Sequence, residues 1–479
     1  MRVCLICEGC YPYVPGGVSS WIQMLCSQFS DVEFVIWAIA TTREEMSEYA
    51  YKIPANVKEI RTLYLGDEAF QRPRRKIKLS AGEKETLKSL MISSVDSINW
   101  MELLELIKKY RRCMSGIVIS ESFFEICLEE YRRQNSKKVF HHFLWNFRGI
   151  YFPLMYILSG DIPKADIYHA VSTGYAGILG SCASYVEQKP LLLSEHGIYT
   201  REREEDIIRS QWVAGDFKEI WINFFKKLSF IAYRQASIVT SLFETNRSLQ
   251  VELNCPEEKI RIIPNGVDAA EYDVCRVEKE FSSENVLLGA VLRVVPIKDV
   301  KTMLLAFDIV KQAAPGARLR LMGNCRENPE YYQECLDLLA ELKTEDVEFV
   351  GQVNIKEHLS DIDLLLLSSI SEGQPLAILE GLAAGIPFVA TNVGNCKALL
   401  EGEREDDHLG LAGLVVPVMN SQAMAEAILS CIRNPDLRRR MGEVGRKRVE
   451  LYYSRQDMMK AFHDLYESLE GSGYGGNRI

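Results

Sequence analysis

Short apolar runs alternate with longer helix-length segments along most of this chain. The runs have the length of β-strands and are rich in Val, Ile and Leu, which is typical of strands buried on both faces. Strands separated by helices build parallel sheets, so the pattern predicts an α/β protein with doubly wound sheets. The expected strands lie at 2–7, 32–40, 57–65, 166–170, 191–194, 237–240, 260–263, 286–292, 317–323, 347–351, 363–368, 387–390 and 414–417.

Residues 66–159 interrupt this alternation with long helical patterns, the clearest at 83–112, 120–133 and 141–157. The stretch is longer than a normal crossover and predicts a helical insertion. Its basic segment Arg72–Lys78 is either a solvated loop or a contact for a partner or membrane surface. Its aromatic run from Phe143 to Tyr156 is either core or the lining of a groove for a sugar acceptor.

The segment 361–391 carries the most informative pattern. An apolar run from Asp363 to Ser368 is followed by a polar turn, and Pro375 to Gly385 then has the length of a helix with Pro at its start and Gly at its end. A second apolar run follows at once. This order predicts a βαβ unit whose loop lies at the carboxyl end of the first strand, where open α/β sheets bind ligands.

Two carboxylates belong to this unit. Every residue from Leu376 to Ile386 is apolar or Gly except Glu380. A buried carboxylate costs several kcal/mol unless it is hydrogen-bonded, so Glu380 needs donors. Glu372 lies in the preceding loop. Either both acids belong to a ligand site, or Glu380 caps a neighbouring loop and Glu372 is ordinary loop polarity.

Three other places carry candidate chemistry. Gly16 and Gly17 lie between a strand and a helix, where backbone amides can approach a phosphate, although most such pairs are only turns. Arg293 and Lys298 follow a strand and could hold a diphosphate or be surface charge. His196 follows a strand end next to Gly, so we expect it to be exposed on a loop, in a site.

Composition limits the function classes. The chain has 479 residues, enough for two or three domains, and is 47% apolar with a mean hydropathy of −0.07. A net charge of −10 and a pI near 5.5 argue against generic binding to nucleic acid or anionic membranes. No apolar run reaches about 18 residues, and residues 1–10 are typical of a first strand and not of a signal peptide. We therefore expect a cytoplasmic protein.

The 13 cysteines favour reduced thiols over disulfides, because they are odd in number and scattered through apolar segments. Cys4, Cys7 and Cys10 have the spacing of an iron–sulfur cluster motif. However, the fourth position is Val14, and Cys4 and Cys7 would point to opposite faces of a strand. We therefore expect no metal and no cofactor.

The string from Glu372 to Glu380, E-G-Q-P-L-A-I-L-E, resembles the E-x7-E motif of the family 4 retaining glycosyltransferases. In that family the first Glu contacts the donor sugar and the second contacts the ribose hydroxyls. The resemblance implies these roles for Glu372 and Glu380. It also implies that the donor meets the start of the helix, at Gln374, Pro375, Leu376 and Ala377.

Further strings resemble the same family. Arg293 and Lys298 match its R-x4-K diphosphate pair, Gly16 and Gly17 match its Gly-Gly loop, and 264–268 matches its P-N-G-V-D string. The turn with Gln352 and Val353 would meet the base through its backbone. His196 would contact the donor sugar at the reacting centre, and the string H-G-I-Y-T-R-E-R from 196 to 203 is similar to the glycosyltransferases of Pel-type exopolysaccharide synthesis.

The resemblance implies a GT-B fold, with two Rossmann-like domains facing a cleft. The expected parts are an N-terminal acceptor-side domain at 1–268 with the insertion at 66–159, a linker at 269–283, a nucleotide-sugar-binding domain at 284–453, a terminal helix at 454–470 that crosses back to the first domain, and a flexible tail at 471–479.

The implied activity is retaining transfer of a hexose or N-acetylhexosamine from a UDP-sugar to a growing polysaccharide. The donor, the acceptor and a membrane-associated polysaccharide synthase complex are the implied partners, which would recruit the protein to the inner face of the membrane; nucleic acid is not expected. The only D-x-D string is Asp361-Ile-Asp363, at the entry to a buried strand, so protein groups would replace a metal. Two alternatives stay open: a UDP-sugar-binding scaffold subunit and a UDP-N-acetylglucosamine epimerase.

Overall fold

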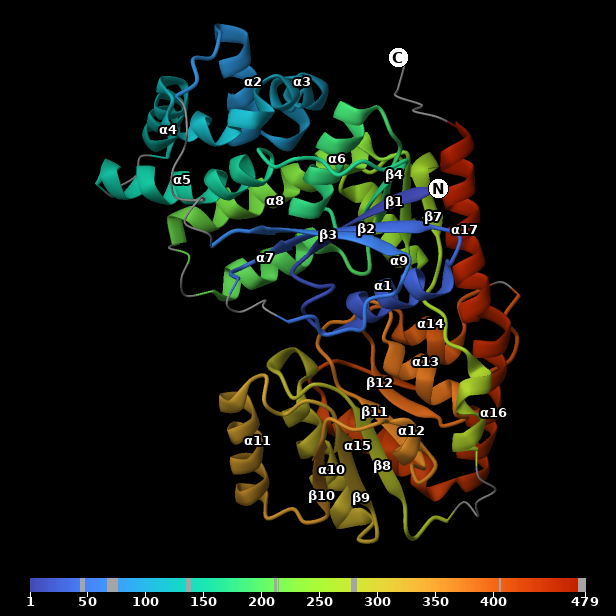
Figure 1. The fold of residues 1–479 in the computed structure, drawn as a ribbon. Coiled ribbons are helices and arrows are strands. Elements are labelled where there is room, and N and C mark those ends of the chain that lie inside the picture. The colour runs from blue at the N-terminus through green and yellow to red at the C-terminus, as the bar shows by residue number, and fades with distance from the viewer. Residues whose placement is uncertain are drawn as a thin grey trace. The chain divides into compact units, whose positions relative to one another are not determined.

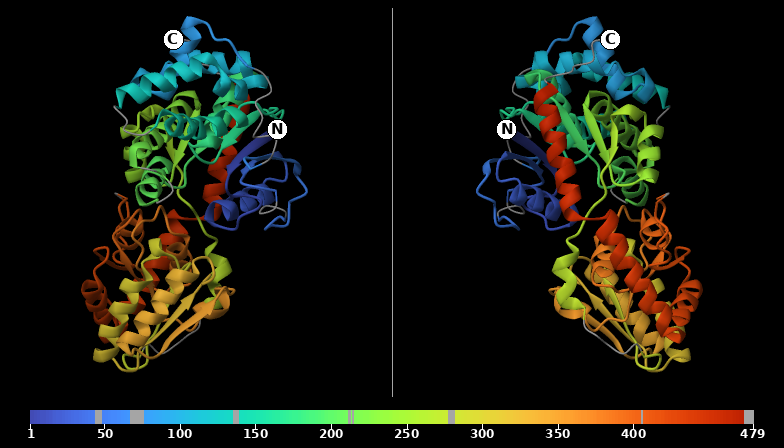
Figure 2. Two further views of the ribbon diagram at one scale, coloured as in Figure 1. Left: turned by 90° about the vertical axis from the view of Figure 1, so that its left-hand side faces the viewer. Right: turned by 90° about the vertical axis from the view of Figure 1, so that its right-hand side faces the viewer.

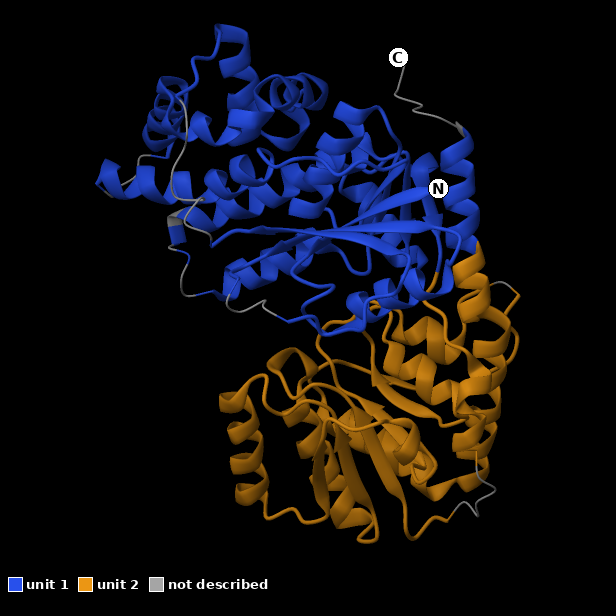
Figure 3. Cartoon of the chain, viewed as in Figure 1, with its two compact units in different colours: residues 1–263, 461–479 blue, residues 264–460 orange. Residues whose placement is uncertain are grey.

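A computed structural model describes residues 1–479 except 44–47, 67–75, 135–138, 211–212, 214, 277–281, 405 and 473–479. The chain divides into two compact units (Figure 3): unit 1 comprises residues 1–263 and 461–479, and unit 2 comprises residues 264–460. Arg72 to Arg75, in the basic segment, lie outside the described residues.

Unit 1 contains a sheet of seven parallel strands in the order β3-β2-β1-β4-β5-β6-β7 (Figure 1). Its central strands are buried on both faces, which is why their sequences are nearly continuous apolar runs. The strands are β1 (Arg2–Glu8), β2 (Glu33–Ala40), β3 (Val57–Tyr64), β4 (Ile167–Ala170), β5 (Leu191–Ser194), β6 (Ile238–Ser241) and β7 (Ile260–Ile262).

Helices α2 to α5 of the predicted insertion gather at one side of unit 1 (Figures 1 and 2), and their apolar faces share one core with α6, α8 and the sheet. The prediction of one helix over 83–112 is wrong, because α2 ends at Met91 and α3 begins after Asn99, whose side chain caps it. The helices of unit 1 are α1 (Gly17–Gln28), α2 (Ala81–Met91), α3 (Trp100–Tyr110), α4 (Glu121–Arg133), α5 (Phe140–Ile157), α6 (Tyr175–Glu187), α7 (Tyr199–Arg209), α8 (Gly215–Gln235) and α9 (Glu244–Glu252).

Unit 2 contains a sheet of six parallel strands in the order β10-β9-β8-β11-β12-β13. Asp363, of the D-x-D string, is used inside this sheet: its carboxylate accepts a hydrogen bond from the Leu287 amide at 2.9 Å. The strands are β8 (Leu287–Val291), β9 (Arg318–Met322), β10 (Val347–Gly351), β11 (Leu364–Leu367), β12 (Phe388–Thr391) and β13 (Gly413–Val416).

The helices of unit 2 surround this sheet, and the last of them is shared by both units, since α17 belongs to unit 2 up to Lys460 and to unit 1 from Ala461. No helix among the described residues is long and apolar enough to cross a membrane. The helices are α10 (Val300–Ala313), α11 (Pro329–Leu342), α12 (Lys356–Leu359), α13 (Leu376–Ala383), α14 (Cys396–Glu401), α15 (Ser421–Arg433), α16 (Pro435–Tyr452) and α17 (Arg455–Ser472), with short 3₁₀ turns η5 (Ala269–Cys275) and η6 (Pro296–Lys298).

Both sheets have the doubly wound strand order, in which the first strand of the unit lies between its second and fourth strands. The two predicted Rossmann-like domains are therefore confirmed. In such sheets ligands bind beyond the carboxyl ends of the strands where the winding direction reverses. This point lies between β8 and β11 in unit 2, and between β1 and β4 in unit 1.

Candidate functional site

At the reversal point of unit 2, the chain brings together a cation and a carboxylate that were predicted separately. Lys298, in the turn η6 after β8, forms an ion pair with Glu372, in the loop after β11. The side chains are only 18% and 11% exposed, so water screens this pair weakly. Ser369 donates a further hydrogen bond to the Glu372 carboxylate at 2.6 Å. The two groups are thus fixed at the place where this fold binds ligands.

Helix α13 begins directly after this loop. Pro375 is its N-cap and provides no side-chain hydrogen bond to the first turn, so the positive end of the helix is left for an anionic group. Gln374 is buried; its side-chain oxygen Oε1 accepts a hydrogen bond from the Asn265 backbone amide at 2.6 Å, while its side-chain nitrogen Nε2 has no partner. This unpartnered hydrogen-bond donor and the start of α13 both belong to the segment that was predicted to contact the sugar-nucleotide.

Glu380 lies on α13 and has the hydrogen-bond donor that its sequence context requires. The Tyr272 hydroxyl, from the turn η5, hydrogen-bonds to its carboxylate, and burial raises the pKa of Glu380 above its usual value. Lys356 and Arg455 act on this pKa in the opposite direction. Sequence reasoning missed Tyr272, since it assigned 269–283 to a linker; the available signal was that Tyr272 is one of only two aromatic residues in this stretch. The ribose role of Glu380 stays a prediction.

Arg293 does not share the environment of Lys298. It is 56% exposed and pairs with Glu327, which follows β9. Gln352 and Val353 follow β10 at Gly351, whose φ of +81° directs the chain into the turn. The Gly351 carbonyl accepts a hydrogen bond from the Gly323 amide at 2.8 Å, which ties the ends of β9 and β10 together. The donor-binding roles of Arg293, Gln352 and Val353 stay predictions.

In unit 1, Gly16 is the N-cap of α1 and Gly17 is its first residue. Both are exposed, and a Cβ added to either would meet no atom within 4 Å. The Gly16 amide donates a hydrogen bond to the Tyr51 hydroxyl at 3.3 Å, and the glycines are not required by packing inside the unit. This leaves the predicted phosphate-binding role open.

A pocket of about 360 Å³ lies at the reversal point of unit 1. It is formed by the loops after β1, β4 and β5 and by the first turns of α7, and its lining includes Glu8, Cys10, Ser172, His196, Tyr199 and Arg203. Glu8 accepts hydrogen bonds from the Tyr199 hydroxyl at 2.7 Å and from the Ala176 amide at 3.1 Å. Sequence reasoning missed Glu8, because its contacts come from α6 and α7, which lie far from it in the sequence.

His196 lines this pocket, but the prediction that it is exposed is wrong. Its ring packs against Trp21 of α1, with ring centroids 4.6 Å apart, and it is only partly accessible. Burial lowers the pKa of His196 to about 4, so the ring is neutral at pH 7. Its Nε2 atom is buried without a hydrogen-bond partner. A neutral imidazole with one free nitrogen can still bond to a ligand hydroxyl.

The neighbouring Glu195 is held in place by hydrogen bonds from three side chains of unit 1. It is buried, and it accepts hydrogen bonds from Tyr233, from Gln250 at 2.9 Å and from Thr173 at 3.2 Å. Burial raises the pKa of this carboxyl to about 7, although the three donors lower it. Glu195 thus anchors the loop that presents His196.

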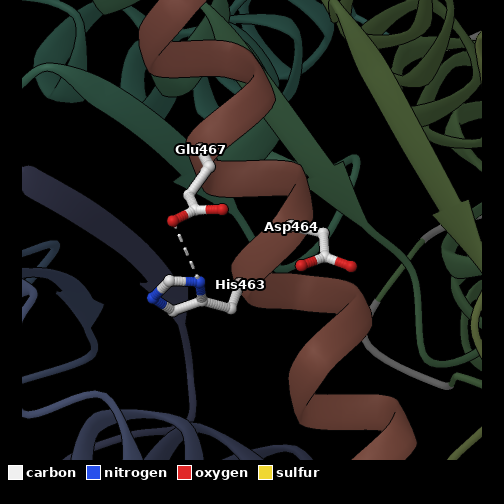
Figure 4. A group of neighbouring side chains, drawn as sticks. All are labelled: His463, Asp464 and Glu467. Atoms are coloured by element: carbon white, nitrogen blue, oxygen red, sulfur yellow. Dashed lines mark ion pairs between the residues drawn. The ribbon is translucent and has the colours of Figure 1, made fainter.

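Among the described residues, one group has potential metal-ligand atoms that lie within 4.8 Å of one another. It consists of His463, Asp464 and Glu467 on α17 (Figure 4). His463 is already paired with Asp31 at 3.0 Å and lies 3.7 Å from Glu467, and the hydrogen bond to Asp31 raises its pKa. All 13 cysteines are free thiols. The metal-free site stays a prediction.

Comparison with protein families divides the chain much as its two units do. Residues 1–258 match the family described as "Domain of unknown function (DUF3492)", and residues 274–448 match the family described as "Glycosyl transferases group 1". The first match covers more than half of the 479 residues. The second contains the whole Lys298–Glu372–Glu380 arrangement.

Curated relatives are glycosyltransferases and related enzymes at low identity. N-acetyl-alpha-D-glucosaminyl L-malate synthase of Bacillus anthracis is 28% identical over 48% of this chain and 60% of its own length. The capsular polysaccharide biosynthesis glycosyltransferase CapM of Staphylococcus aureus is 23% identical over 62% of this chain and 75% of its own length. The chain thus spans about three-fifths of the first relative and three-quarters of the second.

Solved structures support the fold over nearly the whole chain. Anabaena Alr3699/HepE, determined with UDP, superposes with a TM-score of 0.61 at 15% identity over 98% of this chain and 100% of its own. Sucrose-phosphate synthase from Thermosynechococcus elongatus gives a TM-score of 0.61 at 16% identity, again over 98% and 100%. At these identities the likeness concerns the fold alone, which is GT-B.

Proposed function

Because the chain belongs to the family described as "Domain of unknown function (DUF3492)" and carries a group 1 glycosyl transferase domain, we propose that it transfers a sugar from a UDP-sugar, with retention at the anomeric carbon. The observation that carries this proposal is the Lys298–Glu372 pair at the reversal point of unit 2, next to the uncapped start of α13. An ammonium group and a helix N-terminus are suited to a diphosphate.

The proposed chemistry needs stabilisation of a leaving group. As the bond between the anomeric carbon and the diphosphate oxygen breaks, negative charge develops on the nucleotide diphosphate. Lys298 and the first amides of α13 would stabilise that charge, and Arg293 would join them by leaving Glu327. Glu372 would contact the sugar, Glu380 the ribose, and His196 the sugar near the reacting centre. The acceptor oxygen bonds to the anomeric carbon as the bond to the diphosphate oxygen breaks, and the proton of the acceptor hydroxyl passes to the departing diphosphate.

For the substrate we propose a hexose or N-acetylhexosamine and a growing exopolysaccharide acceptor of Pel type. The string from His196 to Arg203 supports this, as does the CapM relative, which is named for capsular polysaccharide biosynthesis. A membrane-associated synthase complex would then be the partner that receives the product. The nucleotide is proposed to be UDP because the solved structure of Alr3699/HepE contains it.

A thermal-shift panel of UDP, GDP and ADP, each with and without EDTA, tests the nucleotide and the absence of a metal. A ligand present at a hundred times its dissociation constant adds about 2.7 kcal/mol of stability, which raises the melting temperature of a unit of this size by about 5–10 °C. We expect UDP alone to give this shift, equally in EDTA and in magnesium. A shift that requires magnesium would contradict the metal-free site.

Replacing His196 with alanine should separate binding from transfer. The proposed contact is with the sugar and not with the nucleotide, so turnover should fall by on the order of 100-fold while UDP affinity changes less than about twofold. Calorimetry with UDP beside a UDP-release assay measures both quantities. An equal loss in both would assign His196 a structural role.

The two other functions are separated by simple product analysis. A binding scaffold would bind UDP-sugar without turnover. An epimerase would convert its UDP-sugar in the absence of any acceptor, whereas a transferase releases UDP only as the sugar moves to an acceptor or to water.

A further inference from the structure

His196 lines the pocket, and its ring also packs against an aromatic cluster that extends to the last helix, α17. Trp21 lies at the centre of this cluster and is 3% exposed. Its ring packs edge-on against His196 at 4.6 Å and against Phe462 of α17 at 5.1 Å. Both separations lie in the range of favourable aromatic pairs. Trp21 is therefore held between the candidate catalytic ring and the terminal helix.

A second line of contacts joins α17 to the same loop. The Tyr466 hydroxyl bonds to Nδ1 of the buried His169 at 2.7 Å, and Nε2 of His169 bonds to Ser194 at 2.7 Å. Ser194 ends β5, two residues before His196, and it also accepts a hydrogen bond from Thr240 at 2.8 Å. Burial lowers the pKa of His169 to about 3, so the ring is neutral and can donate through one nitrogen and accept through the other.

Both lines of contact lead to the loop that carries His196. Phe462 reaches His196 through Trp21, and Tyr466, one helical turn later, reaches the strand end that carries His196. Phe462 also stacks on His169, with centroids 6.2 Å apart, which links the two lines. Such packing fixes both the position of the His196 backbone and the tilt of its ring.

We propose that Trp21 and Phe462 are positioning residues for His196, so that the docking of α17 on unit 1 sets the orientation and hydration of this ring. The inference rests on the proposed function for its effect on turnover, but its geometry does not. Since α17 is shared by both units, the ring that would contact the donor sugar is connected by packed side chains to a helix that begins in unit 2.

The first consequence concerns turnover. A misplacement of about 1 Å at a reacting centre can cost on the order of 100-fold in rate. Phe462→Ala removes the support of Trp21 without touching the pocket, so we expect turnover to fall about tenfold or more while UDP affinity stays within about twofold. Phe462→Leu fills most of the volume and should restore most of the turnover. Leu469→Ala is the matched control, since Leu469 is a buried apolar residue on the same helix, two turns further on.

The second consequence is a titration that does not need activity. Without Phe462 or Trp21, water reaches the imidazole, and the pKa of His196 should rise from about 4 towards its usual value near 6.5. Every variant keeps His169, whose ring packs against both Trp21 and Phe462, and the other titratable groups that line the pocket: Glu8, Cys10, Glu195, Tyr199, Glu202 and Arg203.

Histidine ring resonances of the full chain, followed from pH 5 to pH 8, measure this directly, and the His196→Gln variant assigns the signal. We expect His196 not to titrate in the parent protein or in Leu469→Ala, and to titrate between pH 5 and pH 7 in Trp21→Ala and Phe462→Ala. The acid limb of turnover should move with it. An identical titration in Phe462→Ala and Leu469→Ala would overturn the inference, whereas a parent protein without any sugar transfer would overturn the proposed function and leave the titration to decide the inference.

Discussion

Glu372→Gln should lower sugar transfer by on the order of 100-fold while UDP binds as well as to the parent protein, or more tightly. The reason is the partner of Glu372. Its carboxylate neutralises Lys298, the cation that would hold the diphosphate. The amide leaves this ammonium without a counter-charge, which favours a bound anion, but removes the carboxylate that would contact the sugar. Calorimetry with UDP and a UDP-release assay measure the two effects.

Glu380→Gln should weaken the binding of UDP itself, unlike Glu372→Gln. A charge-assisted hydrogen bond to ribose is worth roughly 1.5–3 kcal/mol, so UDP affinity should fall about tenfold or more. Tyr272→Phe is the matched control, because it removes the observed partner of Glu380 and leaves the carboxylate in place. If both variants lose stability equally and bind UDP like the parent, Glu380 has a structural role and the ribose assignment is wrong.

Gly394→Ala should damage both the stability of unit 2 and its activity. Gly394 has a φ of +51°, and a Cβ at this position would lie 2.2 Å from the Gly373 carbonyl oxygen and 2.3 Å from that of Glu372. Backbone atoms cannot move aside as a flexible side chain can, so the loop carrying Glu372 must shift. We expect a loss of about 2 kcal/mol or more in the free energy of unfolding, with a fall in transfer beyond tenfold.

Gly410→Ala is the control for backbone strain alone. Gly410 also has a positive φ, of +100°, but a Cβ there would meet no atom within 4 Å. Its replacement should cost stability without a change in transfer per folded molecule. Thermal unfolding and the UDP-release assay on both variants separate the two effects, and equal transfer by the two variants would show that the Glu372 loop tolerates displacement.

The elements around the site follow from local sequence patterns. The βαβ unit is confirmed as β11, α13 and β12, because apolar runs of strand length and the Pro and Gly at the helix ends are local signals. Lys298 and Glu372 were predicted as separate site residues, but their ion pair was not, because it depends on β8 and β11 lying side by side in the sheet. Arg293 and Lys298 were expected to act as a pair, but in the structure each forms an ion pair with a different carboxylate, Arg293 with Glu327 and Lys298 with Glu372. Their joint role in binding a diphosphate stays a prediction.

The features that could not be predicted depend on residues far apart in the chain. Nothing near His196 in the sequence indicates that Trp21 covers it, so its exposure was misjudged and its lowered pKa was not foreseen. Glu380 required a donor, but the identity of Tyr272 depends on how η5 packs against α13. The break between α2 and α3 was missed because a polar turn capped by Asn99 interrupts an otherwise helical pattern.

The most direct test of the glycosyltransferase proposal is UDP release from a panel of UDP-hexoses and UDP-N-acetylhexosamines by the purified full-length protein, in EDTA, beside Glu372→Gln. We expect the parent protein to release UDP from at least one donor, and Glu372→Gln to do so at a rate lower by on the order of 100-fold, with UDP binding retained. No release from any donor, or equal release by parent and variant, would contradict it.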